Sequence, residues 1–144
     1  MGEVRVILVI IFLISLTTAL HLQAWRGLRE WLPRLTHRPG LATLLMILSL
    51  VLVHTAEVAL FAVGYAWSVQ WASMGSLEGN LTGGWWDYAY FSASVYTTMG
   101  FGDVVPIGPV RLMAGMESIT GLLMIAWSGA FTYIQMQRFW GKPA

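Results

Sequence analysis

Three long apolar runs constrain the possible folds of this chain more than any other feature of its sequence. They cover residues 6–20, 41–68 and 110–134. A helix that spans a membrane needs roughly 20 apolar residues. The second and third runs are therefore long enough, and the first is long enough only together with its flanking residues. Charged residues make up 10% of the chain, whereas soluble domains contain about 25%, which places most of the chain in lipid.

The first run has two interpretations, a retained membrane helix or a cleaved signal peptide. Its length and the small residues Ala19 and Ala24 fit a signal peptide, but the segment before it carries only one acid and one base. The basic residues favour the retained helix, because three crossings that start outside put both basic segments in the cytoplasm. Six of the eight basic residues lie in these two segments: Arg26, Arg29, Arg34, Arg38, Arg138 and Lys142.

The residues between the second and third runs contain a short helix signal. Residues 73–84 are rich in glycine, which predicts a loop. Residues 85–97 are too short to span a membrane and too apolar for a free loop. They predict a re-entrant helix that begins near Asp87, whose charge suits a helix N-terminus. Irregular backbone at membrane depth must be buried in protein or line water, so residues 98–103 need a pore or a protein sheath around them.

The segment from Thr98 to Asp103 reads T-M-G-F-G-D and carries the functional signal. It resembles the potassium-channel signature T-x-G-[YF]-G-D, and the extra Thr97 before it and the V-V-P after it match the same pattern. The flanking helices match as well, so residues 41–140 resemble a small prokaryotic potassium channel of the pore-loop family. The first helix lies outside this resemblance.

The resemblance implies how such a segment would bind an ion. A dehydrated K⁺ needs oxygen atoms in place of water, and rings of backbone carbonyls from four identical loops can supply them. The glycines allow the unusual backbone angles that point carbonyls inward, and the Phe101 side chain would point away from the axis as a packing strut. The implied ligands are the carbonyls of Thr98, Met99, Gly100 and Phe101 and the hydroxyl of Thr98, with Gly102 completing the filter.

Further residues are expected around this filter. Thr97, Ser94 and Glu117 are predicted to support it, Glu117 through Arg111 or through groups behind the filter. Asp103 would either form an acidic ring at the outer mouth, which concentrates cations, or bond to the pore helix or Trp86.

The third run contains a glycine at the place where the family has a hinge. Gly121 resembles this hinge glycine, although close helix packing would also explain a glycine there, and Gly115 and Gly129 compete for the role. A stripe of side chains on the same helix is predicted to line a cavity: Thr120, Met124 and Ser128.

Two ionisable residues lie near the middle of the second run. His54 and Glu57 are three residues apart and share a helix face, and such residues usually face protein. They suggest a proton-sensitive gate or, as the preferred interpretation, an anchor to the pore helix or inner helix. The three histidines are scattered along the sequence and show no metal-ligand spacing.

The predicted protein is an all-α membrane protein that forms a homotetrameric K⁺ channel in a lipid bilayer, with its C-terminus in the cytoplasm. Because Met99 and Phe101 replace commoner residues, a weakly selective cation channel and a non-conducting subunit remain alternatives. We expect no enzyme activity, no cofactor and no nucleic-acid partner, and the small size favours a prokaryotic inner membrane. The expected boundaries are a membrane helix at 1–25, a basic loop at 26–40 and a pore domain at 41–140, with outer helix 41–68, pore helix 86–97, filter 98–103 and inner helix 109–136.

Overall fold

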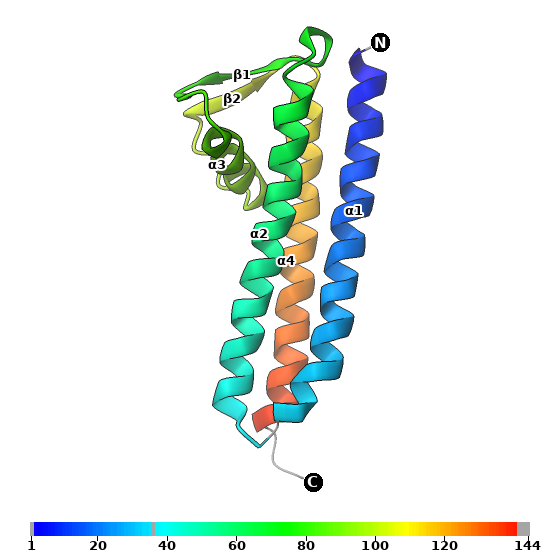
Figure 1. Ribbon diagram of the computed structural model, residues 1–144, viewed down its shortest axis with the longest axis vertical. Helices are drawn as coiled ribbons and strands as arrows, with labels where there is room; N and C mark the ends of the chain where they lie inside the picture. Colours follow the sequence, from blue (N-terminus) through cyan, green and yellow to red (C-terminus); the bar gives the residue numbers. More distant parts are fainter. Residues whose placement is uncertain (1, 36, 141–144) are drawn as a thin grey trace.

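Three long helices form the body of the molecule. The computed structural model describes residues 2–35 and 37–140. It contains α1 (Gly2–Trp31), α2 (Pro39–Ser68) and α4 (Val110–Trp140), which lie side by side along the long axis (Figure 1). Each is long and apolar enough to cross a membrane. The prediction of an all-α membrane protein with three spanning helices is confirmed.

The first helix continues further than the sequence suggested. We expected it to end at residue 25, but α1 reaches Trp31 and is followed by a 3₁₀ turn at Leu32–Leu35. Arg26 and Arg29 are therefore exposed on a helix rather than placed in a loop. Arginine is a good helix former, and its long side chain reaches water from a helix end, so a basic segment at the membrane surface does not have to unwind.

A small outer layer connects α2 to α4. It contains the strand β1 (Ser76–Gly79), the helix α3 (Trp85–Tyr96) and the strand β2 (Val104–Ile107). The strands pair antiparallel, with Ser76 opposite Ile107 (Figure 1). The loop predicted over residues 73–84 is thus partly a strand. The β-branched residues of β2 favour an extended partner, and the pairing holds together the two ends of the segment that contains α3 and residues 97–103.

The first helix packs against α2 and α4, while α3 packs against the same two helices from another side (Figure 1). Two apolar clusters hold α1 in place. One lies at the end of the molecule nearest the two strands and includes Val6 and Ile10 with Phe61 and Tyr65. The other lies at the opposite end, with these members: Leu28, Leu32, Met46, Leu50 and Phe131. The helix is therefore fixed along its length.

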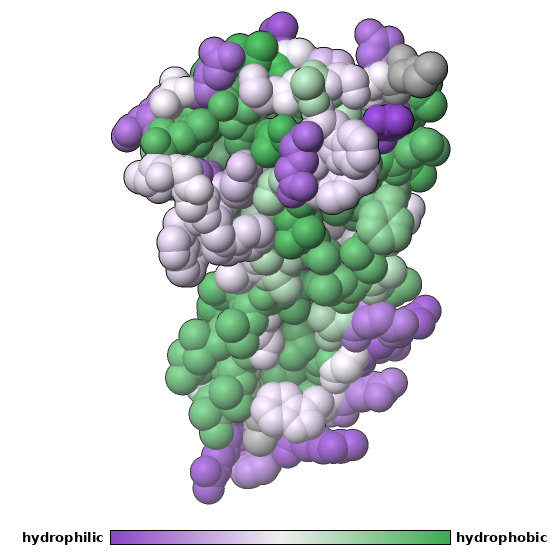
Figure 2. All heavy atoms as spheres, turned by 45° about the horizontal axis from the view of Figure 1, so that its top comes forward, coloured by the Kyte–Doolittle hydropathy of each residue, from purple (hydrophilic) through white to green (hydrophobic). Residues whose placement is uncertain are grey.

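The surface of the molecule matches a protein that lies in lipid. Figure 2 shows hydrophilic residues gathered at the two ends and a broad apolar surface between them. Large apolar side chains are exposed along the outer face of α2, including Leu44, Ile47, Leu48, Val51 and Leu52. Apolar patches of this extent are rare on soluble monomers, and lipid is the environment that accommodates them.

Candidate functional site

The last turn of α3 fixes the start of the predicted filter. Residues 98–103 turn back after Tyr96 and lead to β2. The backbone N–H groups of Met99 and Gly100 donate to the carbonyl of Ser94 at 2.9 and 3.2 Å. The N–H of Phe101 donates to the Ser94 hydroxyl oxygen at 3.3 Å. Ser94 therefore binds three successive amides, and the Thr97 hydroxyl, also predicted as support, donates instead to the Ala93 carbonyl at 2.7 Å.

Every second residue of this segment has a positive φ. The values are 59° at Thr98, 55° at Gly100 and 82° at Gly102. Glycine adopts this region freely, but Thr98 is the only non-glycine residue in the described parts of the chain that does so. A strained threonine persists only where its surroundings hold it, and such residues cluster at functional sites. The alternation departs from a strand, in which successive carbonyls point to opposite sides.

The side chains of residues 98–103 are exposed in the single chain. Met99 is 67% exposed and Phe101 is 62% exposed. Helix α3 of the same chain thus covers little of the Met99 side chain. The Phe101 ring stacks on the Tyr90 ring of α3, with centroids 6.0 Å apart and planes 8° apart. The packing partner of Phe101 therefore belongs to the same chain.

The carboxylate of Asp103 is bonded to α3. It accepts a hydrogen bond of 2.9 Å from the Tyr90 hydroxyl, and not from Trp86, the other expected partner. This hydrogen bond and the charge of Asp103, together with some desolvation, raise the pKa of Tyr90. Asp103 remains exposed, so its charge is still accessible at the surface of the chain.

The N-terminus of α3 is held by a single carboxylate. Asp87 accepts hydrogen bonds from the backbone N–H groups of Thr82, Gly83 and Gly84 at 2.8, 2.6 and 3.2 Å and from the Thr82 hydroxyl at 2.9 Å. Desolvation raises the pKa of Asp87, but these hydrogen bonds outweigh it and the pKa falls below its ordinary value. The helix begins at Trp85, one residue before the expected start.

Glu117 joins three helices behind this segment. Its carboxylate accepts hydrogen bonds of 2.5 Å from the hydroxyls of Tyr65 on α2 and Ser92 on α3. The residue is fully buried. Of its two expected partners, the groups behind the filter are therefore the ones that it contacts.

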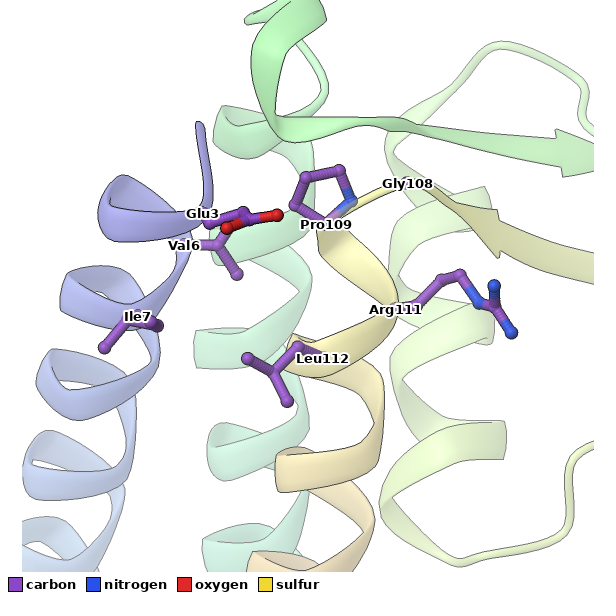
Figure 3. A pocket seen from close by; sticks show the side chains of 7 residues that line it. All are labelled: Glu3, Val6, Ile7, Gly108, Pro109, Arg111 and Leu112. Carbon is purple, nitrogen blue, oxygen red and sulfur yellow. The ribbon is translucent and has the colours of Figure 1, made fainter. Parts of the chain in front are cut away.

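Arg111, the other expected partner of Glu117, lines an open groove at the end of the molecule near the two strands. The groove lies between the first turns of α1 and α4, and Figure 3 shows the Arg111 guanidinium pointing away from Glu3 on the opposite wall. Its remaining lining residues are Val6, Ile7, Gly108, Pro109 and Leu112. None of them belongs to the predicted filter, so the groove is a separate feature.

Gly121 lies where α4 touches the end of α3. A Cβ atom at this position would lie 2.1 Å from the carbonyl oxygen of Tyr96, whereas at Gly115 and Gly129 it would meet nothing within 4 Å. Close packing thus accounts for this glycine, and the hinge role stays a prediction. The predicted cavity stripe is wrong for the subunit, because its members face the other helices of their own chain and are buried: Thr120, Met124 and Ser128.

A polar cluster in the middle of the helices contains a residue that the sequence did not point to. Glu57 accepts hydrogen bonds from Nδ1 of His21 at 2.8 Å and Nδ1 of His54 at 2.9 Å, and also from the Tyr96 hydroxyl. Nε2 of His54 lies 3.0 Å from the Ser128 hydroxyl oxygen. The preferred interpretation of His54 and Glu57 as an anchor to α3 and α4 agrees with these contacts, and His21 extends the anchor to α1.

Two of the three histidines, His21 and His54, therefore lie close together in space. The donor atoms of His21, His54 and Glu57 lie within 4.8 Å of one another, a set of groups that can also attract a transition metal. In this structure the same atoms are already joined to each other by hydrogen bonds. A contact between residues 36 positions apart on different helices has no signal in the sequence.

Comparisons with known proteins agree with this arrangement. A family model described as "Ion channel" matches residues 41–138, which extend from the start of α2 almost to the end of α4. The helix α1 lies outside the matched residues. A comparison with curated proteins and a comparison with solved structures each found no match.

Proposed function

The chain belongs to the ion channel family, whose members are integral membrane proteins that conduct ions passively, and from this premise we propose that it forms a K⁺-selective channel. Four copies would surround one pore, and residues 98–103 of each copy would line its narrowest part. Backbone carbonyls from Thr98 to Phe101 would bind dehydrated K⁺, with no resident cofactor.

The exposure of residues 98–103 carries this proposal. Each of these residues is exposed in the single chain, although the segment follows α3, which lies alongside the spanning helices α2 and α4 (Figure 1). Irregular backbone at such a depth needs protein or water around it. Each subunit has one such segment, so a ring of subunits provides both the protein wall and the water-filled axis.

The charge of the outer layer favours cations. Residues 69–109 contain three acids and no lysine or arginine. Asp103, exposed at the outer end of the filter segment, would form a ring of four carboxylates that concentrates cations. The C-terminal end of α3 carries partial negative charge, and four such ends aimed at the axis would favour a cation there as well.

One observation favours a second candidate, a weakly selective cation channel. Met99 is 67% exposed, so its packing depends on the neighbouring subunit. A flexible thioether holds its surroundings less rigidly than a β-branched side chain. A filter with looser walls would discriminate less sharply between K⁺ and Na⁺.

Flux into liposomes tests these proposals. Purified protein should pass K⁺ and exclude Na⁺, and Gly100→Ala should abolish selective flux while the tetramer survives, because alanine is strained at a φ of 55°. Gly27→Ala, at an open position on α1, is the matched control. Equal K⁺ and Na⁺ fluxes would support the second candidate, and no flux from a confirmed tetramer would indicate a non-conducting subunit. Unchanged K⁺ selectivity in Gly100→Ala would refute the filter assignment.

The direction of the chain in the membrane is part of the proposal. The arginines near the C-terminal ends of α1 and α4, and those in the turn between α1 and α2, lie at one end of the molecule (Figure 1). Positive residues in short loops favour the cytoplasmic side. The N-terminus would then lie outside and the C-terminus inside, in a prokaryotic inner membrane.

A further inference from the structure

Four side chains from three helices form a closed ring in the middle of the molecule. His21 of α1 and His54 of α2 each bind one oxygen of Glu57 through Nδ1, at 2.8 and 2.9 Å. Nε2 of each imidazole faces the hydroxyl oxygen of Ser128 on α4, at 3.5 Å from His21 and 3.0 Å from His54. The ring thus links the helix outside the family match to two helices inside it.

This ring lacks one hydrogen when both imidazoles are neutral. A neutral imidazole has one N–H group, a serine has one O–H group, and a carboxylate has none. The ring therefore has three hydrogens for its four hydrogen bonds. In one of the four contacts, two lone pairs would then face each other. The contact between His21 and Ser128 is the longest of the four, at 3.5 Å, and is the one that lacks a hydrogen. One further proton on an imidazole fills every contact.

The same proton would also give the Glu57 carboxylate a positively charged partner. This residue is fully buried in the middle of α2, and a buried carboxylate needs a positive partner. Among residues 2–35 and 37–140 its ion-pair partners are His21 and His54, and no lysine or arginine pairs with it. An imidazolium in the ring would make the pair neutral overall.

The groups that face the ring from each helix are few. His21 comes from α1, His54 and Glu57 from α2, and the Tyr96 hydroxyl from α3. The helix α4 contributes the Ser128 hydroxyl and the Trp127 ring, whose centroid lies 5.1 Å from that of His21. Glu117 is the next carboxylate, and its oxygens are bonded to Tyr65 and Ser92. Glu57 accepts hydrogen bonds from three donors, which favours its ionised form, so we assign the extra proton to the imidazoles.

We propose that the ring of His21, His54, Glu57 and Ser128 binds one proton per subunit, and that this proton locks α1 onto the pore-forming helices. With the proton bound, one imidazolium donates to Ser128 and the Ser128 hydroxyl donates to the other imidazole. When the proton leaves to water, an unpaired carboxylate and an empty contact remain at this depth. The bound proton stabilises the docked helix, so docking is retained at low pH and weakens as the pH rises and the ring releases its proton.

Tyr96 connects the ring of His21, His54, Glu57 and Ser128 to the filter segment. Tyr96, which donates to Glu57, is the last residue of α3 and packs through its carbonyl against Gly121. The filter segment begins two residues later. Release of the proton would therefore remove a constraint at the base of the filter.

Nitrogen-15 NMR of histidine in the intact protein tests the proton directly. The chain has three histidines, and the exposed His37 is an internal control. Over a pH series, His21 and His54 should together hold one extra proton and lose it in a single shared step as the pH rises. Two neutral imidazoles throughout, or two independent steps for His21 and His54, would overturn the proposal.

Docking is measured by the distance between spin labels on α1 and α2. The chain contains no cysteine, so Leu16→Cys and Leu52→Cys, both at exposed positions, give unique labels. The distance distribution should broaden as the pH rises. In Ser128→Ala this transition should move by about one pH unit towards acid, whereas Ser15→Ala, whose hydroxyl bonds to its own helix, should leave it in place. Identical transitions in both variants would contradict the lock.

Adding Zn²⁺ tests whether the positive partner of Glu57 in the ring is a proton or a metal ion. If the ring is built for a proton, added Zn²⁺ should leave the histidine spectrum near pH 7 unchanged apart from signals of His37. Stoichiometric Zn²⁺ binding that shifts both His21 and His54 would overturn the proposal in favour of a metal site. None of these readouts depends on flux, so they remain informative if the channel proposal fails.

Discussion

Glu57 and Glu117 are carboxylates with no exposed surface, and each accepts hydrogen bonds from more than one helix. They act as cross-links at two depths. Glu117 joins α2, α3 and α4, and Glu57 joins α1, α2 and α3. Because an unsatisfied buried charge is costly, each carboxylate favours the one arrangement of helices that satisfies it.

The hydroxyl of Tyr65 can be removed with almost no change in volume. Tyr65→Phe leaves one oxygen of the buried Glu117 without its 2.5 Å hydrogen bond, so the free energy of unfolding in detergent should fall by about 1–3 kcal/mol. Tyr133→Phe, at a position that is 64% exposed, is the control and should change little. Equal unfolding midpoints for the two variants would show that the Glu117 hydrogen bonds do not hold the helices.

Gly121 is the position where a single methyl group should matter most. In Gly121→Ala the new carbon would lie 2.1 Å from the Tyr96 carbonyl oxygen, so α3 and α4 would have to separate, at a cost of about 1–3 kcal/mol of stability. Gly129→Ala meets nothing within 4 Å and should be neutral or stabilising, because alanine favours a helix. Thermal unfolding compares the two. A Gly121→Ala protein as stable as Gly129→Ala would leave the hinge as the better explanation.

At the scale of the elements, a single carboxylate organises the start of α3. Asp87 accepts hydrogen bonds from the backbone amides of the three residues before the helix, Thr82, Gly83 and Gly84, and so ties the first turn to the preceding loop. In Asp87→Asn, hydrogen exchange of the amides in the first turn of α3 should become faster, while the exposed Glu30→Gln on α1 should leave it unchanged. Similar exchange in both variants would mean that the sheet, not the cap, orders α3.

The same cap has a defined pH dependence. Because its hydrogen bonds lower the pKa of Asp87 below the ordinary value of 3.8, its contribution to stability is present above that value and is lost as the pH falls through the lowered pKa. Acid should therefore accelerate exchange in α3 of the wild type, and Asp87→Asn should lack this acid step.

The elements also show which features a sequence can predict. The spanning helices follow from contiguous apolar runs, and residues 98–103 form a contiguous motif, so both signals are local. The pairing of Ser76 with Ile107 and the contact of His21 with Glu57 join distant segments whose own residues do not specify a partner. The orientation of α4 was missed for a similar reason, because the spacing of Thr120 and Ser128 defines a stripe but not the neighbour that the stripe faces.

At the scale of the whole molecule, the chain has two different sides. The helix α3 and the exposed residues 98–103 lie away from α1, and α1 covers another side of α2 and α4 (Figure 1). If four copies place residues 98–103 around one axis, α1 lies at the periphery, with its exposed apolar residues towards lipid. The proton lock would then transmit a change from the lipid-facing helix to the base of the filter.

The direction of the chain across the membrane is testable with two matched variants. Glu78 on β1 and Glu30 near the end of α1 are both exposed and lie at opposite ends of the molecule. The chain has no cysteine, so Glu78→Cys and Glu30→Cys each give one reactive thiol. Because basic residues favour the cytoplasmic side, a membrane-impermeant maleimide should label Glu78→Cys in intact cells and Glu30→Cys only after permeabilisation. The reverse pattern would place the filter's acidic mouth inside the cell, and labelling of both in intact cells would show mixed insertion.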